Sequence, residues 1–331
     1  MRPPPAAHPD AEQTRAICGA VIGAYRAAGA EPNPTELGLL TAFASIVFGA
    51  TFDAATVDPV SRTELAAVIT DPVMQAMTLR LMGTLEFAML APPPGLPDAV
   101  LAYARALGIE EPMLDAASDR AEEHVAEMYA DIQRHSWYNH ETARRALEGR
   151  LGEIVRSRIA MLGGPEDEDL ARKWRALGEC PAGSWGRGVY DFYQANGFAF
   201  PGEHGSIRVV GAEHDWVHVL SDYDTSPEGE IDVFSFIAAS MRSEEGFALL
   251  FTTLGIFQNG TIHHVAGEEI TNATTGALSA PGAFDRIADA FRRGRATTDD
   301  VLGDVDHFAW KDVPLEAART RLNVLPRSVT A

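Results

Sequence analysis

The amino-acid sequence predicts an all-α protein, and three observations lead to this prediction. Apolar residues recur at helical spacing along most of the chain, as at Ile17, Val21, Ile22 and Tyr25. Proline, glycine and small polar residues separate these segments at the positions where helices begin and end. No block of the sequence is rich in strand patterns, and no internal repeat has a fixed spacing.

The predicted elements follow one another with short connections. A Gly-Ala-Glu-Pro break ends the first helix, Ser61 is the expected N-cap of the third, and the proline-rich stretch 91–97 is a linker. The least regular part is 258–280, which could include a short strand pair around Thr261–Val265. The expected helices are 11–29, 34–48, one after Ser61, 72–90, 98–107, 112–135, 140–162, 168–177, 184–196, 207–223, 227–241, 244–257, 281–294 and 314–322.

Two composition shifts suggest the domain organisation. Four prolines fall in residues 1–10, which predicts a flexible tail. The run Met161-Leu-Gly-Gly-Pro-Glu-Asp-Glu-Asp169 combines a Gly-Gly-Pro break with acidic charge and is the expected domain boundary. We therefore expect a helical N-terminal domain at 11–162, of unknown role, and a second helical domain at 168–326.

Composition excludes several classes of function. The formal net charge is −20, which argues against a general nucleic-acid binder because such a protein needs a basic face. The chain carries two cysteines, Cys18 and Cys180, too few for a disulfide framework or a cysteine-based metal site. The sequence contains no signal-peptide pattern and no uninterrupted apolar run of about 18 residues. A cytoplasmic protein is the expectation.

The sharpest chemical pattern lies at residues 214–230. His214 and His218 are four residues apart, so a helix would project both imidazoles from one face. Asp215 adjoins the first histidine, and Glu230 follows a turn in which Ser226 and Pro227 are suited to begin a second helix. Two imidazoles and two carboxylates make a set of ligands for a divalent metal ion. The alternative is that both histidines are ordinary buried or capping residues, and the spacing alone does not decide between these interpretations.

The sequence around this pattern resembles the coenzyme Q (ubiquinone) biosynthesis protein 4 family over about residues 170–325. That family carries His-Asp-x-x-His, eleven residues and then Glu, as at His214, Asp215, His218 and Glu230. Further blocks follow the family in the same order. They are Pro181-Ala-Gly-Ser-Trp-Gly-Arg187 with Asn196-Gly-Phe198, Gly246-Phe-Ala-Leu-Leu250, Ala290-Phe-Arg-Arg-Gly294, and Pro314-Leu-Glu-Ala-Ala-Arg319 with Leu322.

The chain also departs from the family. Ser221-Asp222 stands where members usually have Thr-Gly, and Trp310-Lys311 stands where Trp-Glu is expected. Four residues after His218, Asp222 would share the helical face of both histidines, as an extra ligand, as a partner to a histidine or as a solvated acid. The substrate can therefore differ even if the metal site is kept.

The resemblance implies a helical metalloprotein of ubiquinone biosynthesis that acts on a prenylated aromatic head group. Its chemistry would be removal of the ring carboxylate with hydroxylation at that carbon. The implied ligands are His214, Asp215, His218 and Glu230, and zinc is the implied ion, although iron, cobalt or manganese also suits two nitrogens and two oxygens. No residue is assigned a catalytic role, and no glycine fingerprint for a flavin or nicotinamide is present.

The resemblance implies a prenylated quinone precursor or another isoprenoid lipid and other biosynthetic proteins as partners, whereas pairing with a second copy of the chain stays open. The expected place is the cytoplasm, and the resemblance adds peripheral association at the inner face of the membrane as an alternative. Two further functions stay open: a non-catalytic scaffold that binds an isoprenoid or quinone lipid, and a related metalloenzyme of a specialised pathway.

Overall fold

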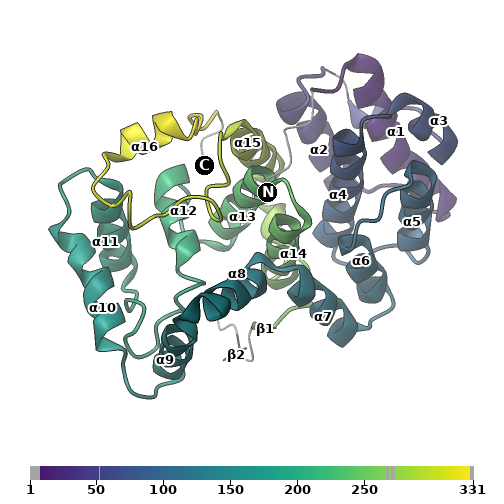
Figure 1. Cartoon of the computed structure of the whole chain (residues 1–331). Helices are drawn as coiled ribbons and strands as arrows, with labels where there is room; N and C mark the ends of the chain where they lie inside the picture. Colours follow the sequence, from purple (N-terminus) through teal and green to yellow (C-terminus); the bar gives the residue numbers. More distant parts are fainter. Residues whose placement is uncertain (1–7, 52, 266–267, 270–272, 329–331) are drawn as a thin grey trace. The chain divides into compact units, whose positions relative to one another are not determined.

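The computed structural model describes residues 8–51, 53–265, 268–269 and 273–328, and almost all regular structure in them is helical (Figure 1). The predicted all-α class is confirmed. Among the described residues one short strand pair is present: β1 (His264–Val265) pairs antiparallel with β2 (Glu268–Glu269), close to the predicted position.

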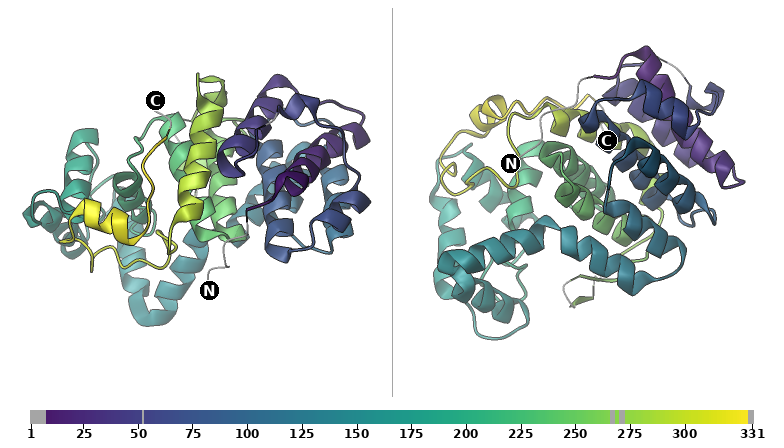
Figure 2. Two further views of the ribbon diagram at one scale, coloured as in Figure 1. Left: turned by 90° about the horizontal axis from the view of Figure 1, so that it is seen from above. Right: turned by 45° about the vertical axis from the view of Figure 1, so that its right-hand side comes forward.

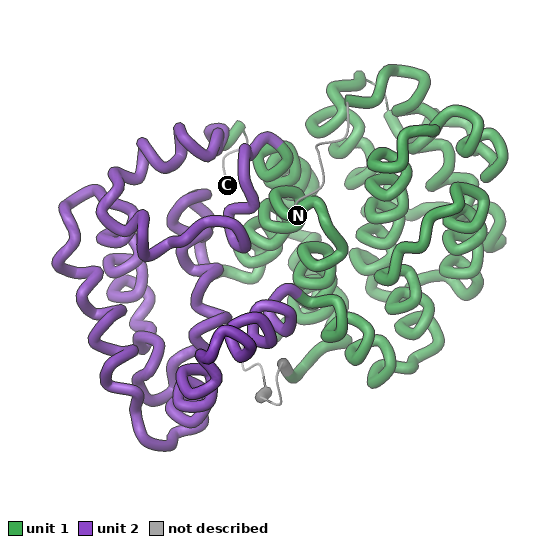
Figure 3. Tube along the Cα trace, in the orientation of Figure 1, with its two compact units in different colours: residues 1–136, 226–295, 327–331 green, residues 137–225, 296–326 purple. Residues whose placement is uncertain are grey.

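The chain divides into two compact units, coloured separately in Figure 3. Unit 1 contains residues 1–136, 226–295 and 327–331, and unit 2 contains residues 137–225 and 296–326. These units divide the chain differently from the predicted domains 11–162 and 168–326, because the segment 226–295 packs with the N-terminal helices. Of the predicted tail at 1–10, residues 1–7 lie outside the described residues, whereas Pro9 is buried and Asp10 caps the first helix.

Unit 1 contains these elements: α1 (Ala11–Ala27), α2 (Pro34–Ala42), the π-helix η1 (Phe43–Val47), the 3-10 helix η2 (Ala54–Thr56), α3 (Arg62–Val68), α4 (Pro72–Ala88), α5 (Leu96–Leu107), α6 (Met113–Ala121), α7 (Val125–His135), α13 (Pro227–Met241), α14 (Glu244–Phe257), β1, β2, the 3-10 helix η5 (Ala277–Ser279) and α15 (Ala283–Ala296, to Arg295).

Unit 2 contains these elements: α8 (Trp137–Arg145), the π-helix η3 (Ala146–Arg150), α9 (Leu151–Met161), α10 (Glu168–Arg175), the 3-10 helix η4 (Ala176–Glu179), α11 (Trp185–Asn196), α12 (Glu213–Ser221) and α16 (Leu315–Arg321).

Side-chain caps explain why several helices begin where the sequence predicts. Asp10, Asn33 and Ser61 each complete a capping box with a Gln or Glu three residues later. In such a box the cap side chain accepts a hydrogen bond from the backbone of the third helical residue, whose own side chain accepts one from the cap backbone. These local contacts satisfy backbone N–H groups that a helix leaves open at its first turn.

Two predicted helices are interrupted. The expected helix 112–135 is split into α6 and α7 at Glu123, which adopts a left-handed conformation with φ of 62°. The expected helix 140–162 is split at Gly149, where φ is 84° and glycine tolerates the left-handed region. Apolar periodicity continues through both breaks, which explains why the sequence pattern predicted single helices.

Unit 1 has an apolar core in which α14 is central. This helix packs against α13, α4, α6 and α7, and further views of these helices appear in Figure 2. Phe251 of α14 stacks on Phe87 of α4, with ring centroids 4.3 Å apart. Beyond the end of α14, Gln258 and Asn259 donate hydrogen bonds to the carbonyl oxygens of Ala88 and Phe87, so the α14 segment also caps α4.

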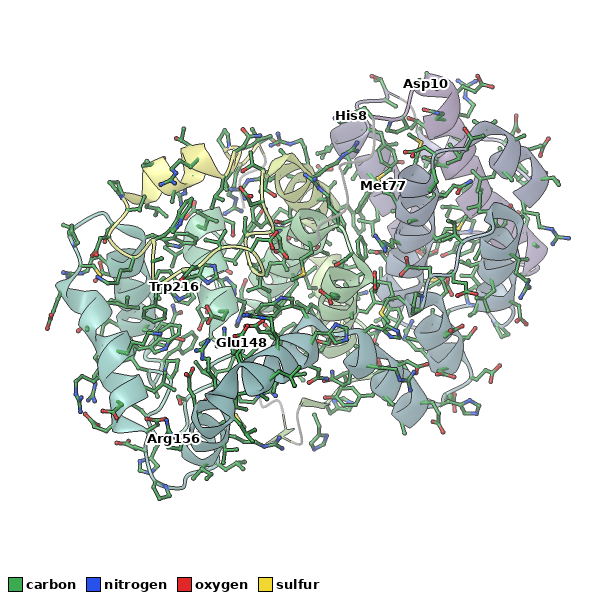
Figure 4. All side chains as sticks on the ribbon, viewed as in Figure 1. His8, Asp10, Met77, Glu148, Arg156 and Trp216 are labelled. Carbon is green, nitrogen blue, oxygen red and sulfur yellow. The ribbon has the colours of Figure 1, made fainter. Side chains whose placement is uncertain are left out.

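The core of unit 2 is aromatic. Trp174, Trp185 and Trp216 are fully buried, and the Trp185 indole nitrogen donates a hydrogen bond to the carbonyl oxygen of Trp216 (Trp216 is labelled in Figure 4). His307 stacks on Trp216 with an interplanar angle of 7°. This cluster fixes α12, the helix that carries both histidines of the predicted metal site. In neither unit does a described helix have the length and apolar character needed to cross a bilayer.

Candidate metal centre

The helix α12 carries three of the four predicted metal ligands and is shorter than the sequence predicts. The expected helix covers 207–223, but α12 runs from Glu213 to Ser221, and residues 209–212 form turns. No side chain caps its N-terminus, whereas Glu213 and Asp215 place negative charge in its first turn. Such charge is favourable there because the helix dipole is positive at that end.

His214 and His218 lie on one face of α12, as their spacing predicts. Both are buried, with exposed fractions of 8% and 1%, and their ring centroids are 5.1 Å apart. Phe192 of α11 stacks on the His218 ring at 5.5 Å. The two imidazoles are therefore held close together in an environment that is largely closed to water.

Each imidazole is oriented through its Nδ1 atom. Nδ1 of His214 lies 2.6 Å from the carbonyl oxygen of Gly211, and Nδ1 of His218 lies 3.2 Å from that of Tyr223. A carbonyl oxygen can only accept, so each Nδ1 carries a proton, and in the neutral imidazole the lone pair is then on Nε2. Histidines that bind metals commonly have this arrangement, in which the second ring nitrogen donates to a carbonyl or carboxylate.

Asp215 is buried beside the first histidine. Its Oδ2 accepts a hydrogen bond from the Tyr193 hydroxyl, and its Oδ1 lies 3.5 Å from Nε2 of His214. Burial, together with the neighbouring Asp215 carboxylate, raises the pKa of Tyr193 well above its usual value. Tyr193 therefore remains a protonated donor that holds the Asp215 carboxylate in position.

Glu230 stands in the first turn of α13. Ser226 caps this helix by accepting a hydrogen bond from the backbone of Gly229 at 3.0 Å, and Pro227 is its first residue, as predicted. Glu230 belongs to unit 1, whereas His214, Asp215 and His218 belong to unit 2, so Glu230 as a ligand stays a prediction of the sequence resemblance. Within unit 2 the Asp215 carboxylate lies close to His214.

Asp222 does not share the helical face of the histidines. The helix has ended before it, and Asp222 is the C-cap of α12 in a left-handed conformation with φ of 62°. Its side chain is exposed, and its backbone N–H donates to the carbonyl oxygen of His218 at 2.9 Å. Glycine adopts this conformation without strain, and aspartate is one of the few residues that tolerate it. The left-handed backbone thus suits the glycine that the family usually has at this position and also tolerates Asp222.

A buried ionic network supports the start of α12, and sequence reasoning missed it. Glu213 accepts hydrogen bonds from Arg145 Nη2 and His307 Nδ1, both at 2.8 Å. Nε2 of His307 donates to the carbonyl oxygen of Val301 at 2.9 Å, and Arg145 Nε donates to Glu141 at 2.6 Å. Burial alone would raise the pKa of Glu213, but the hydrogen bonds and charges of His307 and Arg145 outweigh it and lower this pKa to about 2.

One member of this network is visible in the local sequence, the acid Glu213 directly before His214. Arg145 and His307 are 68 and 94 residues away from Glu213, and no local pattern pairs residues so far apart. The network anchors the first turn of α12 within unit 2 and so fixes the direction in which its histidines point.

The comparisons with known proteins are sparse. No family model matches the chain, and no curated protein matches it. A solved structure from Nostoc punctiforme, provisionally described as a ubiquinone biosynthesis protein, is similar over 76% of this chain and 97% of that one. The sequence identity is 16% and the TM-score is 0.31, and at this TM-score the likeness does not bear on function.

Proposed function

We propose that the chain is a metal-dependent protein of the coenzyme Q biosynthesis protein 4 type, which acts on the carboxylated phenolic head group of a prenylated substrate. His214, His218 and Glu230 would hold the divalent ion, and Asp215 is the candidate fourth ligand. The proposal rests on the sequence resemblance over residues 170–325 and on the arrangement of the two histidines.

One observation carries the metal assignment: the Nδ1 atom of each imidazole donates a hydrogen bond to a backbone carbonyl oxygen. In the neutral imidazole the lone pair is then on Nε2, and the Asp215 carboxylate beside His214 supplies negative charge. Two neutral imidazoles and a carboxylate form a donor set that suits zinc, and also iron, cobalt or manganese. When bound, the ion would act as a Lewis acid that polarises the oxygens of a phenol-carboxylate head group.

The protein's own side chains would position the site. Tyr193 would keep the Asp215 carboxylate directed at His214, and Phe192 would hold the plane of the His218 ring. The Glu213 network would fix the first turn of α12.

Replacing a ring carboxylate by a hydroxyl group, with release of carbon dioxide, is a two-electron oxidation. An oxidant such as dioxygen must accompany the substrate, so metal binding and turnover can be tested separately.

The first experiment measures metal in purified chain by elemental mass spectrometry. We expect about one equivalent of a divalent ion in the wild type and a loss of tenfold or more in His218→Ala. His204→Ala is the matched control, because His204 lies in the same unit but is exposed and pairs with Glu166. A wild-type chain that binds no divalent ion when titrated with zinc, iron, cobalt or manganese would contradict the site.

The second experiment separates an enzyme from a lipid-binding scaffold. Metal-loaded chain is incubated with a prenylated hydroxybenzoate and dioxygen, and release of carbon dioxide is followed for the wild type and for His218→Ala. Turnover that disappears with the metal supports the enzyme. Turnover that survives loss of all four ligands would rule out the proposed chemistry, and stoichiometric lipid retention without turnover would favour the scaffold.

A further inference from the structure

The helix α9 presents an apolar face to solvent. Leu151, Val155 and Ile159 recur every four residues, and Leu162 follows at the C-cap. On an α-helix these positions fall within an arc of about 80°. The exposed fractions are 57% for Leu151, 47% for Val155, 41% for Ile159 and 63% for Leu162, and Leu147 in the preceding η3 is 90% exposed. We call Leu151, Val155, Ile159 and Leu162 the α9 stripe.

The opposite face of α9 is anchored within unit 2, so the helix cannot rotate about its axis to bury the stripe. Ser157 and Ala160 are buried, and the Ser157 hydroxyl accepts a hydrogen bond from the backbone of Val209 at 2.9 Å. Arg156 pairs with the buried Asp167 at 2.8 Å and further limits rotation of the helix (Glu148 and Arg156 mark this stretch in Figure 4). A soluble helix normally buries its apolar face, so this reversed pattern indicates an interaction surface.

We propose that the α9 stripe pairs with the same stripe of a second copy of this chain, with the two helices antiparallel about a two-fold axis at Val155. The stripe is nearly symmetric about that residue, because Leu151 and Ile159 lie four residues to either side. An antiparallel pair therefore places Leu151 opposite Ile159 of the partner subunit. Such self-complementarity is the requirement for an isologous dimer.

The size of the stripe fits a second copy. With Leu147 the exposed apolar area is roughly 500 Å², at the upper end for an isolated monomer surface. Two copies would bury about 1,000 Å², the lower limit for a specific interface, so the dimer should form and dissociate with concentration.

The chemistry of the stripe disfavours a membrane as the partner. The chain carries a net charge of −20, which opposes docking on anionic lipid. The stripe is also aliphatic throughout, whereas helices that lie in a bilayer surface commonly carry Trp or Phe on the apolar face. If the stripe instead docks on a membrane, the chain will bind neutral vesicles as a monomer, and this outcome would contradict the dimer.

The first test measures mass by sedimentation over a concentration series. The wild type should rise from 35.7 kDa toward twice that mass. Val155→Glu should weaken association at least tenfold, because it places a charge at the centre of each apolar surface. Leu90→Glu is the matched control, since Leu90 is an exposed leucine of unit 1 that lies outside the stripe. Unchanged circular dichroism of both variants would show that folding is intact.

The second test checks the antiparallel register by oxidative cross-linking. Val155→Cys should give a disulfide-linked dimer, since two residues on the axis face each other. Leu151→Cys alone should not, because its two copies would lie about 12 Å apart along the helices, and a disulfide needs Cα atoms within about 7 Å. A mixture of Leu151→Cys and Ile159→Cys should cross-link. The native Cys18 and Cys180 are buried, so the wild type is the blank.

The outcomes decide the proposal. A dimer that Val155→Glu dissociates and Val155→Cys cross-links supports it. A wild type that stays at the monomer mass, a dimer that survives Val155→Glu, or a monomer that binds neutral vesicles through the stripe overturns it. The metal content of the chain is a separate measurement and does not depend on this result.

Discussion

Unit 1 contains a buried glutamate and unit 2 a largely buried one, each near an arginine, yet the two carboxyl groups behave in opposite ways. Glu213 of unit 2 has its pKa lowered to about 2. Glu86 of unit 1 has its pKa raised to about 8 by burial, even though the charge of Arg120 acts in the other direction. Burial alone therefore does not decide the charge state of an acid in this protein.

Hydrogen bonding explains the difference. The two carboxylate oxygens of Glu213 accept bonds from Arg145 and His307. Neither carboxylate oxygen of Glu86 has a hydrogen-bond partner among the described residues, because the Arg120 guanidinium donates instead to the carbonyl oxygens of Glu86, Met89 and Leu90. Hydrogen bonds to the charged form offset desolvation at Glu213, whereas only Coulomb attraction opposes it at Glu86.

The largest expected effect comes from breaking the network of unit 2. Arg145→Met leaves the Glu213 and Glu141 carboxylates without their shared buried partner, and this should lower the free energy of unfolding by about 3–5 kcal/mol. All five tryptophans lie in unit 2, so urea unfolding followed by tryptophan fluorescence reports on that unit.

Arg144→Met is the control for this change. Arg144 pairs with Glu141 and Glu148, but its side chain is 57% exposed. Solvent screening should keep its effect below about 1 kcal/mol. Equal losses in the two variants would show that burial of the Arg145 pairs has no special importance.

The second prediction concerns acid stability. The pKa of Glu213 is lower in the folded than in the unfolded chain, so its stabilisation is complete above pH 4.5 and is lost as the pH falls toward 2. The loss should reach about 3 kcal/mol, and Glu213→Gln should remove this part of the pH dependence. Tryptophan-monitored urea unfolding at pH 6, 4 and 3 tests this. A wild type and a Glu213→Gln chain with the same acid slope would contradict the hydrogen-bonded network.

The third prediction concerns Glu86, whose contribution to the pH dependence of stability has the opposite sign to that of Glu213. The folded chain keeps the Glu86 proton up to about pH 8, whereas the unfolded chain releases it near pH 4.5, so the folded state loses stability as the pH rises between these values. Glu86→Gln, which resembles the protonated acid, should be neutral near pH 4 and should stabilise by about 3 kcal/mol at pH 7. Far-ultraviolet circular dichroism is the suitable probe, because unit 1 contains no tryptophan. Destabilisation at pH 7 would mean that the charged form is the native one.

The smallest expected effect is at two helix ends, one in each unit. Asp222 ends α12 and Arg242 ends α13, both with φ near 60°. Asp222→Gly should stabilise unit 2 by less than about 1 kcal/mol and leave the metal content unchanged. Arg242→Gly should not stabilise, because the Arg242 guanidinium also donates to the carbonyl oxygen of Arg295. Loss of metal in Asp222→Gly would instead show that Asp222 takes part in the site.

Local sequence determined much of the secondary structure. The capping residues Asp10, Asn33, Ser61 and Ser226 place four helix starts, because a cap acts within one turn of its helix. The four-residue spacing of His214 and His218 was enough to place both rings on one face, since helix geometry fixes that relation. The ends of helices were less predictable, as the early end of α12 at Ser221 shows.

Only the tertiary structure decided how distant segments combine. It joins α13 and α14 to the N-terminal helices, where α14 fills an apolar core that the sequence assigned to another domain. It brings Arg145 and His307 to Glu213, and it leaves the buried Glu86 carboxyl group without a hydrogen-bond partner among the described residues. The physical reason is that helix formation depends on neighbours within a turn, whereas the pairing of buried charges and apolar faces depends on packing between residues far apart in the chain.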